Sequence, residues 1–415
     1  MRKSLVAVAS ALAAVSAWSA VEVADGIEVT RDDATGVVSV SYSLTATAGE
    51  AAGIVTADLI DPNGAVIAGA LGNATGDVFR RVTVGTAHAF SWKPDAAAKG
   101  LSTGCSFRLT AWNLSSPPDY MAIDLTGTKD VTYYENAAQV PGGVKVQAYF
   151  LSKLLMRKIP AAQVKWHQGK ASPAEWSGEQ IQRWTTLTED FYIGVYELTR
   201  GQHWFVDSAQ SYIRSSTLRK TDVAFLMPAQ GMNFNEFYGD GTEPDSTKWL
   251  GKAFEKTGVR LNLPTEAQWE YACRAGSSGT RYGTLADIAV YQDNAPKNAS
   301  GKCIPAHGGT KLPNNWGLYD MIGNMFEYVK DWMNPEAHVD SSDATNPTGP
   351  AEYINFDTRS EELGHKTQRG SAGKMWRGGC YEYGNTFTTA TYPYAWGKWG
   401  TSNAMQGFRL ICPVQ

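Results

Sequence analysis

Three acidic residues lie within a stretch of glycines and aromatic side chains, GLYDMIGNMFEYVKDW, at residues 317–332. They are Asp320, Glu327 and Asp331. A buried carboxylate needs a hydrogen-bond donor, a cation or a metal ion. The Gly323-Asn324 pair predicts a tight turn, because glycine adopts a positive φ without steric cost. Such a turn can direct main-chain carbonyl oxygens toward the carboxylates.

The oxygens around this turn are of the kind that a hard cation prefers. Asp320 and Glu327 enclose the turn, so together with two main-chain carbonyls they would form an oxygen-only set that Ca²⁺ accepts. The candidate ligands are Asp320, Gly323, Met325 and Glu327. Alternatively, the carboxylates only accept backbone N–H bonds within an irregular loop. Spacing alone favours this second interpretation.

Two further segments would position this loop. In LPTEAQWEYACRAG, residues 263–276, a capping box at Thr265 predicts a helix that begins near Glu266. Its buried stripe would consist of Trp269, Ala272 and Cys273, at i, i+3 and i+4 spacing. The segment DFYIGVYELT alternates as a strand, and we expect Glu197 within it to be held by hydrogen bonds of the fold.

The 415-residue chain predicts two domains after a secretory signal peptide at residues 1–20, which has a basic start, an apolar run and small residues. Residues 21–135 show short alternating segments separated by turn clusters, which indicates an all-β immunoglobulin-like sandwich. Proline and paired glycines mark a linker at residues 136–145. The second domain would cover residues 146–415.

The composition excludes some partners and leaves others open. The formal net charge is −4, and no run of Lys or Arg occurs, so neither nucleic acid nor an anionic membrane surface is expected as a partner. No stretch after the signal segment is long and apolar enough for membrane insertion. We therefore expect an exported protein, in the periplasm, on the cell surface or outside the cell. The sequence does not determine its oligomeric state.

Five signatures together resemble the formylglycine-generating enzyme family, the sulfatase-modifying-factor domain. They are residues 317–332, LPTEAQWEYACRAG, DFYIGVYELTRGQ, WRGGCY at 376–381 and GFRL at 407–410. The resemblance covers roughly residues 149–412 and implies an α+β domain with an irregular C-type lectin-like fold. It also implies that the positions of Asp320, Gly323, Met325 and Glu327 hold a structural calcium ion.

The resemblance also bears on the five cysteines, an odd number that leaves at least one thiol unpaired within the chain. The family joins the cysteine of the helix to one just after GFR, which implies a Cys273–Cys412 disulfide here. A Cys303–Cys380 disulfide has weaker support. Disulfides are permitted in an exported protein.

Members that oxidise cysteine hold copper with two thiolates shortly after a GGS motif. Counted from Gly378-Gly379, the matching positions are Tyr383 and Thr388, which cannot act as thiolates. Cys380 replaces the serine of the motif and would be the only catalytic thiol. Copper is therefore not expected, and whether the chain is an enzyme stays open.

The last segment is rich in aromatic residues among glycine, threonine and asparagine. In the family this region lines the substrate groove, and such a mixture suits recognition of a peptide or glycan. The candidate ligand contacts are Trp376, Arg377, Tyr381, Tyr383, Phe387, Tyr394, Trp396 and Trp399. Alternatively, the rings only attach a long loop to the core. The resulting hypothesis is a non-catalytic binding module, and the alternative is a formylglycine-generating or related oxidase with an altered metal centre based on Cys380.

Overall fold

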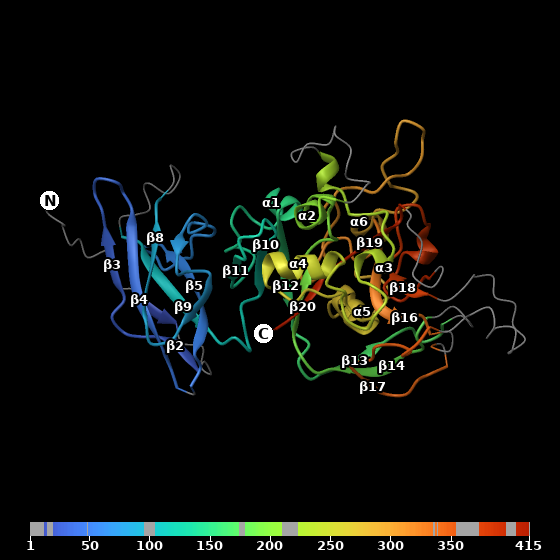
Figure 1. Cartoon of the computed structure of the whole chain (residues 1–415), viewed down its shortest axis with the longest axis horizontal. Helices are drawn as coiled ribbons and strands as arrows, with labels where there is room; N and C mark the ends of the chain where they lie inside the picture. The colour runs from blue at the N-terminus through green and yellow to red at the C-terminus, as the bar shows by residue number, and fades with distance from the viewer. Residues whose placement is uncertain are drawn as a thin grey trace, which may run out of the picture. The chain divides into compact units, whose positions relative to one another are not determined.

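The computed structural model describes residues 12–14, 20–47, 49–94, 104–173, 179–209, 223–334, 337, 339–353, 373–395 and 404–414. The chain divides into two compact units (Figure 1). The first contains residues up to Ala122 with Val131–Val146, and the second contains Ile123–Asp130 with Gln147–Pro413. The segment expected to link two domains, residues 136–145, falls within the first unit. Trp396 and Trp399 lie outside the described residues, as does most of the expected signal peptide.

The first unit is built from two β-sheets. One has the order β1 (Leu12–Ala14), β9 (Ser106–Trp112), β5 (Ala52–Ile60), β7 (Arg80–Thr83). The other has β2 (Val21–Val23), β4 (Val38–Ala46), β8 (Ala87–Trp92), β6 (Thr75–Gly76), with β3 (Glu28–Arg31) also paired to β4. Burial alternates along β4 and β9, as expected for strands with one face toward a core.

Aromatic rings join these two sheets. Phe107 of β9 makes edge contacts with Phe90 and Trp92 of β8, with ring centroids 5.9 Å apart in both pairs. The all-β character expected for this region is confirmed. Strands β10 (Tyr120–Asp124) and β11 (Val131–Tyr134) follow, and β10 includes the residue where the first unit gives way to the second.

The second unit contains three groups of short strands. In the first, β15 (Phe191–Gly194) pairs antiparallel with both β12 (Lys153–Ile159) and β20 (Ile411–Pro413). The second has the order β13 (Val164–Gln168), β14 (Arg183–Leu187), β17 (Ala344–Thr345). In the third, β16 (Phe326–Trp332) is central, antiparallel to β18 (Lys374–Arg377) and parallel to β19 (Gln406–Phe408).

Short helices and long connections complete this unit. The helices are α1 (Ala148–Leu151), α2 (Arg200–Val206), α3 (Phe234–Phe237), α4 (Trp249–Thr257), α5 (Glu266–Arg274) and α6 (Leu285–Ile288), with 3₁₀ turns η2 (Val223–Leu226) and η3 (Asn385–Phe387). The expected irregular α+β class is confirmed. Within the described residues, no helix has the length and apolar character needed to cross a membrane.

Helix α5 lies in the core of the second unit. Thr265 forms the expected capping box, accepting a bond from the Gln268 N–H, and the helix begins at Glu266 as predicted. Trp269, Ala272 and Cys273 are fully buried, which confirms the predicted stripe. They pack in a cluster with residues of β12, β15, β16 and β20.

The structure does not contain the expected Cys273–Cys412 disulfide, because all five cysteines, which lie within the described residues, are free thiols. Cys273 faces the carbonyl of Met321, with Sγ 3.8 Å from the oxygen. Ile411 is the residue of β20 that joins the cluster around Cys273. Since side chains alternate along a strand, Cys412 points to the other face. Cys303 and Cys380 are likewise unbonded to each other.

Candidate functional site

The loop before β16 contains the tight turn expected from the sequence. Gly323 and Asn324 have φ of 82° and 57°. A Cβ on Gly323 would lie 2.5 Å from the carbonyl oxygen of Val290, so the turn requires glycine for space as well as for its φ. Asp320 also adopts a positive φ, of 56°.

Beside this turn, Glu327 forms a buried ion pair with Arg409. Nε and Nη2 of Arg409 lie 2.9 and 2.6 Å from Oε1, and Nε also lies 3.0 Å from Oε2. The indole N–H of Trp269 donates to Oε2 at 2.6 Å. Both oxygens of Glu327 are therefore already occupied by donors of the protein.

The other two carboxylates beside the turn accept bonds from the main chain. Glu197 accepts from the Met325 N–H at 2.9 Å and from the Asn324 amide at 2.6 Å, which confirms that the fold holds Glu197 by hydrogen bonds. Asp320 Oδ2 accepts from the Gly309 N–H at 2.6 Å, whereas Oδ1 is buried without a hydrogen-bond partner.

Arg409 does not balance all of this negative charge. Burial, reinforced by Asp320 and Glu327, raises the pKa of Glu197 well above its usual range. Burial also raises the pKa of Asp320 to about 6. Burial and the neighbouring charges thus favour the protonated form of Glu197 and, below about pH 6, that of Asp320.

The residues at the turn do not fit a calcium ion as they are arranged. Calcium takes six to eight oxygen ligands at about 2.3–2.6 Å. Both oxygens of Glu327 are occupied by Arg409 and Trp269, whereas Oδ1 of Asp320 has no hydrogen-bond partner. Within the described residues, no group of three or more His, Cys, Asp or Glu side chains could hold a metal ion.

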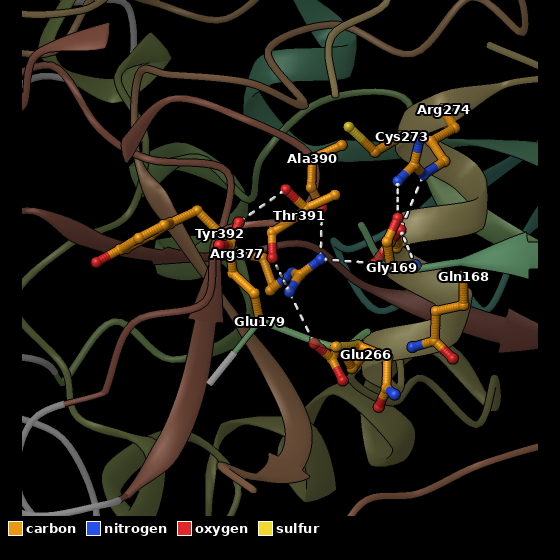
Figure 2. Close-up of polar contacts among 12 residues, drawn as sticks. Gln168, Gly169, Glu179, Glu266, Cys273, Arg274, Arg377, Ala390, Thr391 and Tyr392 are labelled. Carbon is orange, nitrogen blue, oxygen red and sulfur yellow. Dashed lines mark hydrogen bonds and ion pairs between the residues drawn. The ribbon is translucent and has the colours of Figure 1, made fainter. Parts of the chain in front are cut away.

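A second buried network joins α5 to β18 (Figure 2). Nη1 of Arg377 lies 2.7 Å from Glu266, and Nη2 lies 2.9 Å from Glu270. Arg274 contacts Glu270 from the same helix at 2.8 Å and donates to the Gly169 carbonyl at 2.7 Å. Two carboxylates thus balance two guanidinium groups in the interior.

This network gives Arg377 a structural position rather than a ligand-facing one. Its side chain is fully buried and also donates to the carbonyls of Ala390 and Thr391, so it anchors the last loop to α5. Trp376 beside it is also buried. The ion pairs of Glu266, Glu270 and Arg274 were not predicted from the sequence. The four-residue spacing of these residues, which places them on one helix face, was the available signal.

The remaining described aromatic residues of the candidate groove pack mainly against one another. Tyr381 is buried and donates to the Ala404 carbonyl. Tyr383 makes edge contacts with Phe387 and Tyr394 at centroid distances of 5.2 and 5.8 Å. Tyr394 stacks on Trp376 at 5.3 Å. These contacts favour the interpretation that the rings attach the loop, although Tyr383, Phe387 and Tyr394 keep partly exposed surface.

Cys380 lies at the start of this loop and is buried. Desolvation raises the pKa of its thiol to about 12, so the thiolate is strongly disfavoured at neutral pH. The two positions that the resemblance matches to the thiolates of the family are Tyr383 and Thr388. Tyr383 packs against the ring of Phe326, and the Thr388 hydroxyl donates to the Gly384 carbonyl at 2.9 Å.

Two cavities that the sequence analysis did not anticipate lie beside β16. The larger, of about 810 Å³, is lined by the loop at 238–243, the segment 348–353 and residues Lys330, Trp332 and Lys374. The smaller, of about 310 Å³, is lined by Gln168, Gln180, Arg183, Glu266, Ala267, Asp331, Trp332, Asn334, Ala337, Asp340, residues 347–350 and Met375. No single motif predicts them, because their walls come from distant segments.

A family model described as the sulfatase-modifying factor enzyme 1-like domain matches residues 165–414. The chain belongs to this family. The resemblance drawn from the five sequence signatures is therefore confirmed, and the matched residues of the sulfatase-modifying-factor domain lie in the second unit apart from the terminal Val414.

Curated relatives match shorter stretches of the domain. The formylglycine-generating enzyme of Thermomonospora curvata is 32% identical over 117 residues, which cover 25% of this chain and 35% of that enzyme. The formylglycine-generating enzyme of Bos taurus is 28% identical over 154 residues, covering 30% of this chain and 38% of the enzyme. Serine/threonine-protein kinase pkn1 of Chlamydia pneumoniae is 30% identical over 107 residues, covering 26% of this chain and 16% of the kinase. The chain thus spans well under half the length of these relatives.

Two solved structures are similar to the chain at low identity. Treponema denticola variable protein 1 aligns with a TM-score of 0.48 and 19% identity, covering 63% of this chain and 95% of that chain. PvdO from Pseudomonas aeruginosa aligns with a TM-score of 0.44 and 19% identity, covering 63% of this chain and 94% of that chain.

Proposed function

We propose that the sulfatase-modifying-factor domain of this protein is a non-catalytic module that binds a peptide or a glycan. The proposal includes export, for which the basic and apolar residues of the N-terminal segment are the ground. The β-sandwich before the domain would act as a spacer or docking unit. Retention of the family scaffold without its oxidative centre is the basis of the proposal.

The observation that carries this proposal is the state of Cys380. Copper(I) chemistry of the kind implied by the family requires soft thiolate ligands, preferably two. Cys380 is buried, and the pKa of its thiol is raised to about 12. Tyr383 and Thr388, which the resemblance matches to the paired thiols, are engaged in ring packing and hydrogen bonding respectively.

A second candidate function is an oxidase with an altered centre. The free thiol of Cys380, located next to the paired glycines of the family motif, is the observation that favours it. It would act on a cysteine of a protein substrate, as the resemblance to the formylglycine-generating enzyme family implies. This function would require the loop to open, because the thiol is shielded from solvent.

A peptide-oxidation assay separates the two functions. The purified chain is incubated with copper, oxygen and a peptide of CxPxR type, and aldehyde product is followed by mass spectrometry. We expect no aldehyde above the level of a reaction without protein. Enzymatic formation of the aldehyde would overturn the binding proposal.

Two serine variants identify the group responsible if any product forms. Cys380→Ser removes the candidate thiol, and Cys412→Ser is a matched control because Cys412 is also a buried free thiol whose pKa is raised to about 12. Loss of activity in Cys380→Ser alone would assign the chemistry to Cys380. Equal loss in both variants would indicate destabilisation of the fold.

A further inference from the structure

The two cavities beside β16 adjoin each other. Trp332, Thr348 and Pro350 line both of them, so we call the 310 Å³ space the inner cavity and the 810 Å³ space the outer cavity. Small-molecule sites commonly have volumes of about 300–1,000 Å³. The inner cavity is thus large enough for one small ring, and the outer cavity for further units of the same ligand.

Two residues that line the inner cavity, Gln168 and Arg183, carry buried hydrogen-bond donors without partners. Gln168 is almost completely buried, and its Oε1 accepts from the Thr185 hydroxyl at 2.9 Å and from Arg183 at 3.4 Å. These two donors fix the orientation of the amide, which leaves Nε2 as the free end. Neither Gln168 Nε2 nor Arg183 Nε has a hydrogen-bond partner. A buried donor left unpaired costs about 1–3 kcal/mol, so a ligand oxygen here would bind favourably.

Another part of the wall presents acceptors. Glu266 and Asp331 both line the inner cavity, and Asp331 Oδ2 accepts from the Glu266 N–H at 2.8 Å. Glu266 Oε1 is held by Arg377, which fixes this carboxylate in the network of Figure 2. Burial raises the pKa of both groups, that of Asp331 to about 7. Hydroxyl groups of a ligand would donate hydrogen bonds to these buried carboxyl groups.

The outer cavity combines aromatic surface with polar side chains of both signs. Tyr238, Trp332 and Tyr353 contribute rings, and Trp332 meets Tyr353 edge-on at 5.7 Å. Asp240, Glu243, Glu352, Lys330 and Lys374 supply the charges. Rings beside polar groups suit a ligand with apolar faces and hydroxylated edges.

We propose that the inner and outer cavities together bind an uncharged saccharide chain, with one terminal ring in the inner cavity. The hydroxyl groups of a sugar both donate and accept, so they can match the amide and guanidinium N–H groups and the carboxylates at the same time. Asp331 and Glu266 would repel an anion. Arg183 is paired with Asp340 at 3.3 Å, and a cation would offer no acceptor to the free N–H groups of Gln168 and Arg183. This inference rests on the proposed binding function and assigns it a site and a ligand class.

Titration with defined neutral sugars tests the proposal. Maltotriose, cellotriose, mannotriose and tri-N-acetylchitotriose are added separately to the full chain, and binding is measured by calorimetry. We expect at least one to bind with a Kd below about 1 mM, an affinity ordinary for a small polar ligand. Failure of all four to bind at 10 mM, on the order of ten times that Kd, would overturn the saccharide class without affecting the assignment as a non-catalytic module.

Variants locate the bound sugar. Thr348→Arg places a bulky side chain where the cavities meet and should weaken binding at least tenfold. Thr345→Arg is its matched control, because Thr345 is exposed in the same segment and lines neither cavity. Gln168→Met should also weaken binding at least tenfold, with Gln163→Met as the exposed control. Equal affinity in Thr348→Arg and Thr345→Arg would place the sugar elsewhere and overturn the site.

Melting temperatures distinguish loss of the site from loss of the fold. Thr348 is exposed, so the melting temperature of Thr348→Arg should equal that of the wild type. If Gln168→Met melts much lower, Thr348→Arg alone decides the location. Binding of an unstructured peptide that Thr348→Arg abolishes, together with no sugar binding, would also contradict the proposal.

Discussion

At the scale of single residues, buried carboxylates differ in how completely the protein neutralises them. Glu270 contacts both Arg274 and Arg377, and Glu327 is paired with Arg409. Removing one partner of such a pair typically costs about 3–5 kcal/mol, because the other charge stays buried. Asp331 has no comparable cation in direct contact among the described residues, and its pKa is raised to about 7 by burial and then by Glu266.

Asp331 should therefore make stability depend on pH. Its pKa is about 7 in the folded protein and 3.8 as the ordinary value, so the folded state binds the proton more tightly. The free energy of unfolding then decreases as pH rises from about 4 to about 7 and is level above that range. Asp331→Asn removes this contribution. Relative to wild type, the variant should gain about 4 kcal/mol between pH 4 and pH 8, since each pKa unit corresponds to about 1.4 kcal/mol.

Urea denaturation at pH 4 and pH 8 measures this difference. Asp343→Asn is the control, because Asp343 forms an exposed ion pair with Lys165. Exposed pairs contribute about 0–1 kcal/mol, so the control should change stability little at either pH. An Asp331→Asn variant whose stability runs parallel to wild type from pH 4 to pH 8 would contradict the assignment.

At the scale of elements, α5 organises the second unit because its different faces contact different parts of that unit. One face packs Trp269 and Cys273 into the apolar cluster, and another carries the carboxylates that hold Arg377. Its first turn also contributes Glu266 to the inner cavity. The start of this helix therefore fixes the core, the last loop and the candidate binding site together.

The capping box at Thr265 should have a measurable effect on stability. Its hydroxyl accepts from the Gln268 N–H at 3.2 Å, so Thr265→Ala leaves a helical N–H without its partner. The expected loss is about 1 kcal/mol in the free energy of unfolding. Thr284→Ala is a close control, because Thr284 stands at the N-cap of α6 but makes no side-chain capping bond. Equal losses of unfolding free energy in both variants would show that the side-chain capping bond of α5 does not stabilise the protein.

At the scale of the whole molecule, the family scaffold is retained, and the loop at which the resemblance implied a calcium ion carries an internal ion pair. Glu327 bonds Arg409, which reaches across from the connection between β19 and β20 and also donates to carbonyls of Gly194 and Tyr319. The side chain of Arg409 thereby joins three separate chain segments.

Removal of metal should consequently leave the stability unchanged. We expect the melting temperature of the protein in excess EDTA to equal that in millimolar CaCl₂ to within about 1 °C, because a ligand stabilises only a state that it binds. The measurement is a thermal unfolding curve under both conditions at one ionic strength. A clear decrease in EDTA that calcium reverses would restore the calcium site expected from the sequence resemblance.

The sequence by itself determined the family, the α+β class, the all-β region and the local features that depend on near neighbours. The turn at Gly323, the capping box at Thr265 and the stripe around Trp269 are of this kind, because helical and turn geometry follow from spacing along the chain. The tertiary structure decided which charges meet. Arg377 pairs with Glu266, which lies more than 100 positions away, and the cavities join segments near residues 168, 266, 331 and 348. Sequence spacing carries no signal for such contacts, since they depend on how separate elements pack in space.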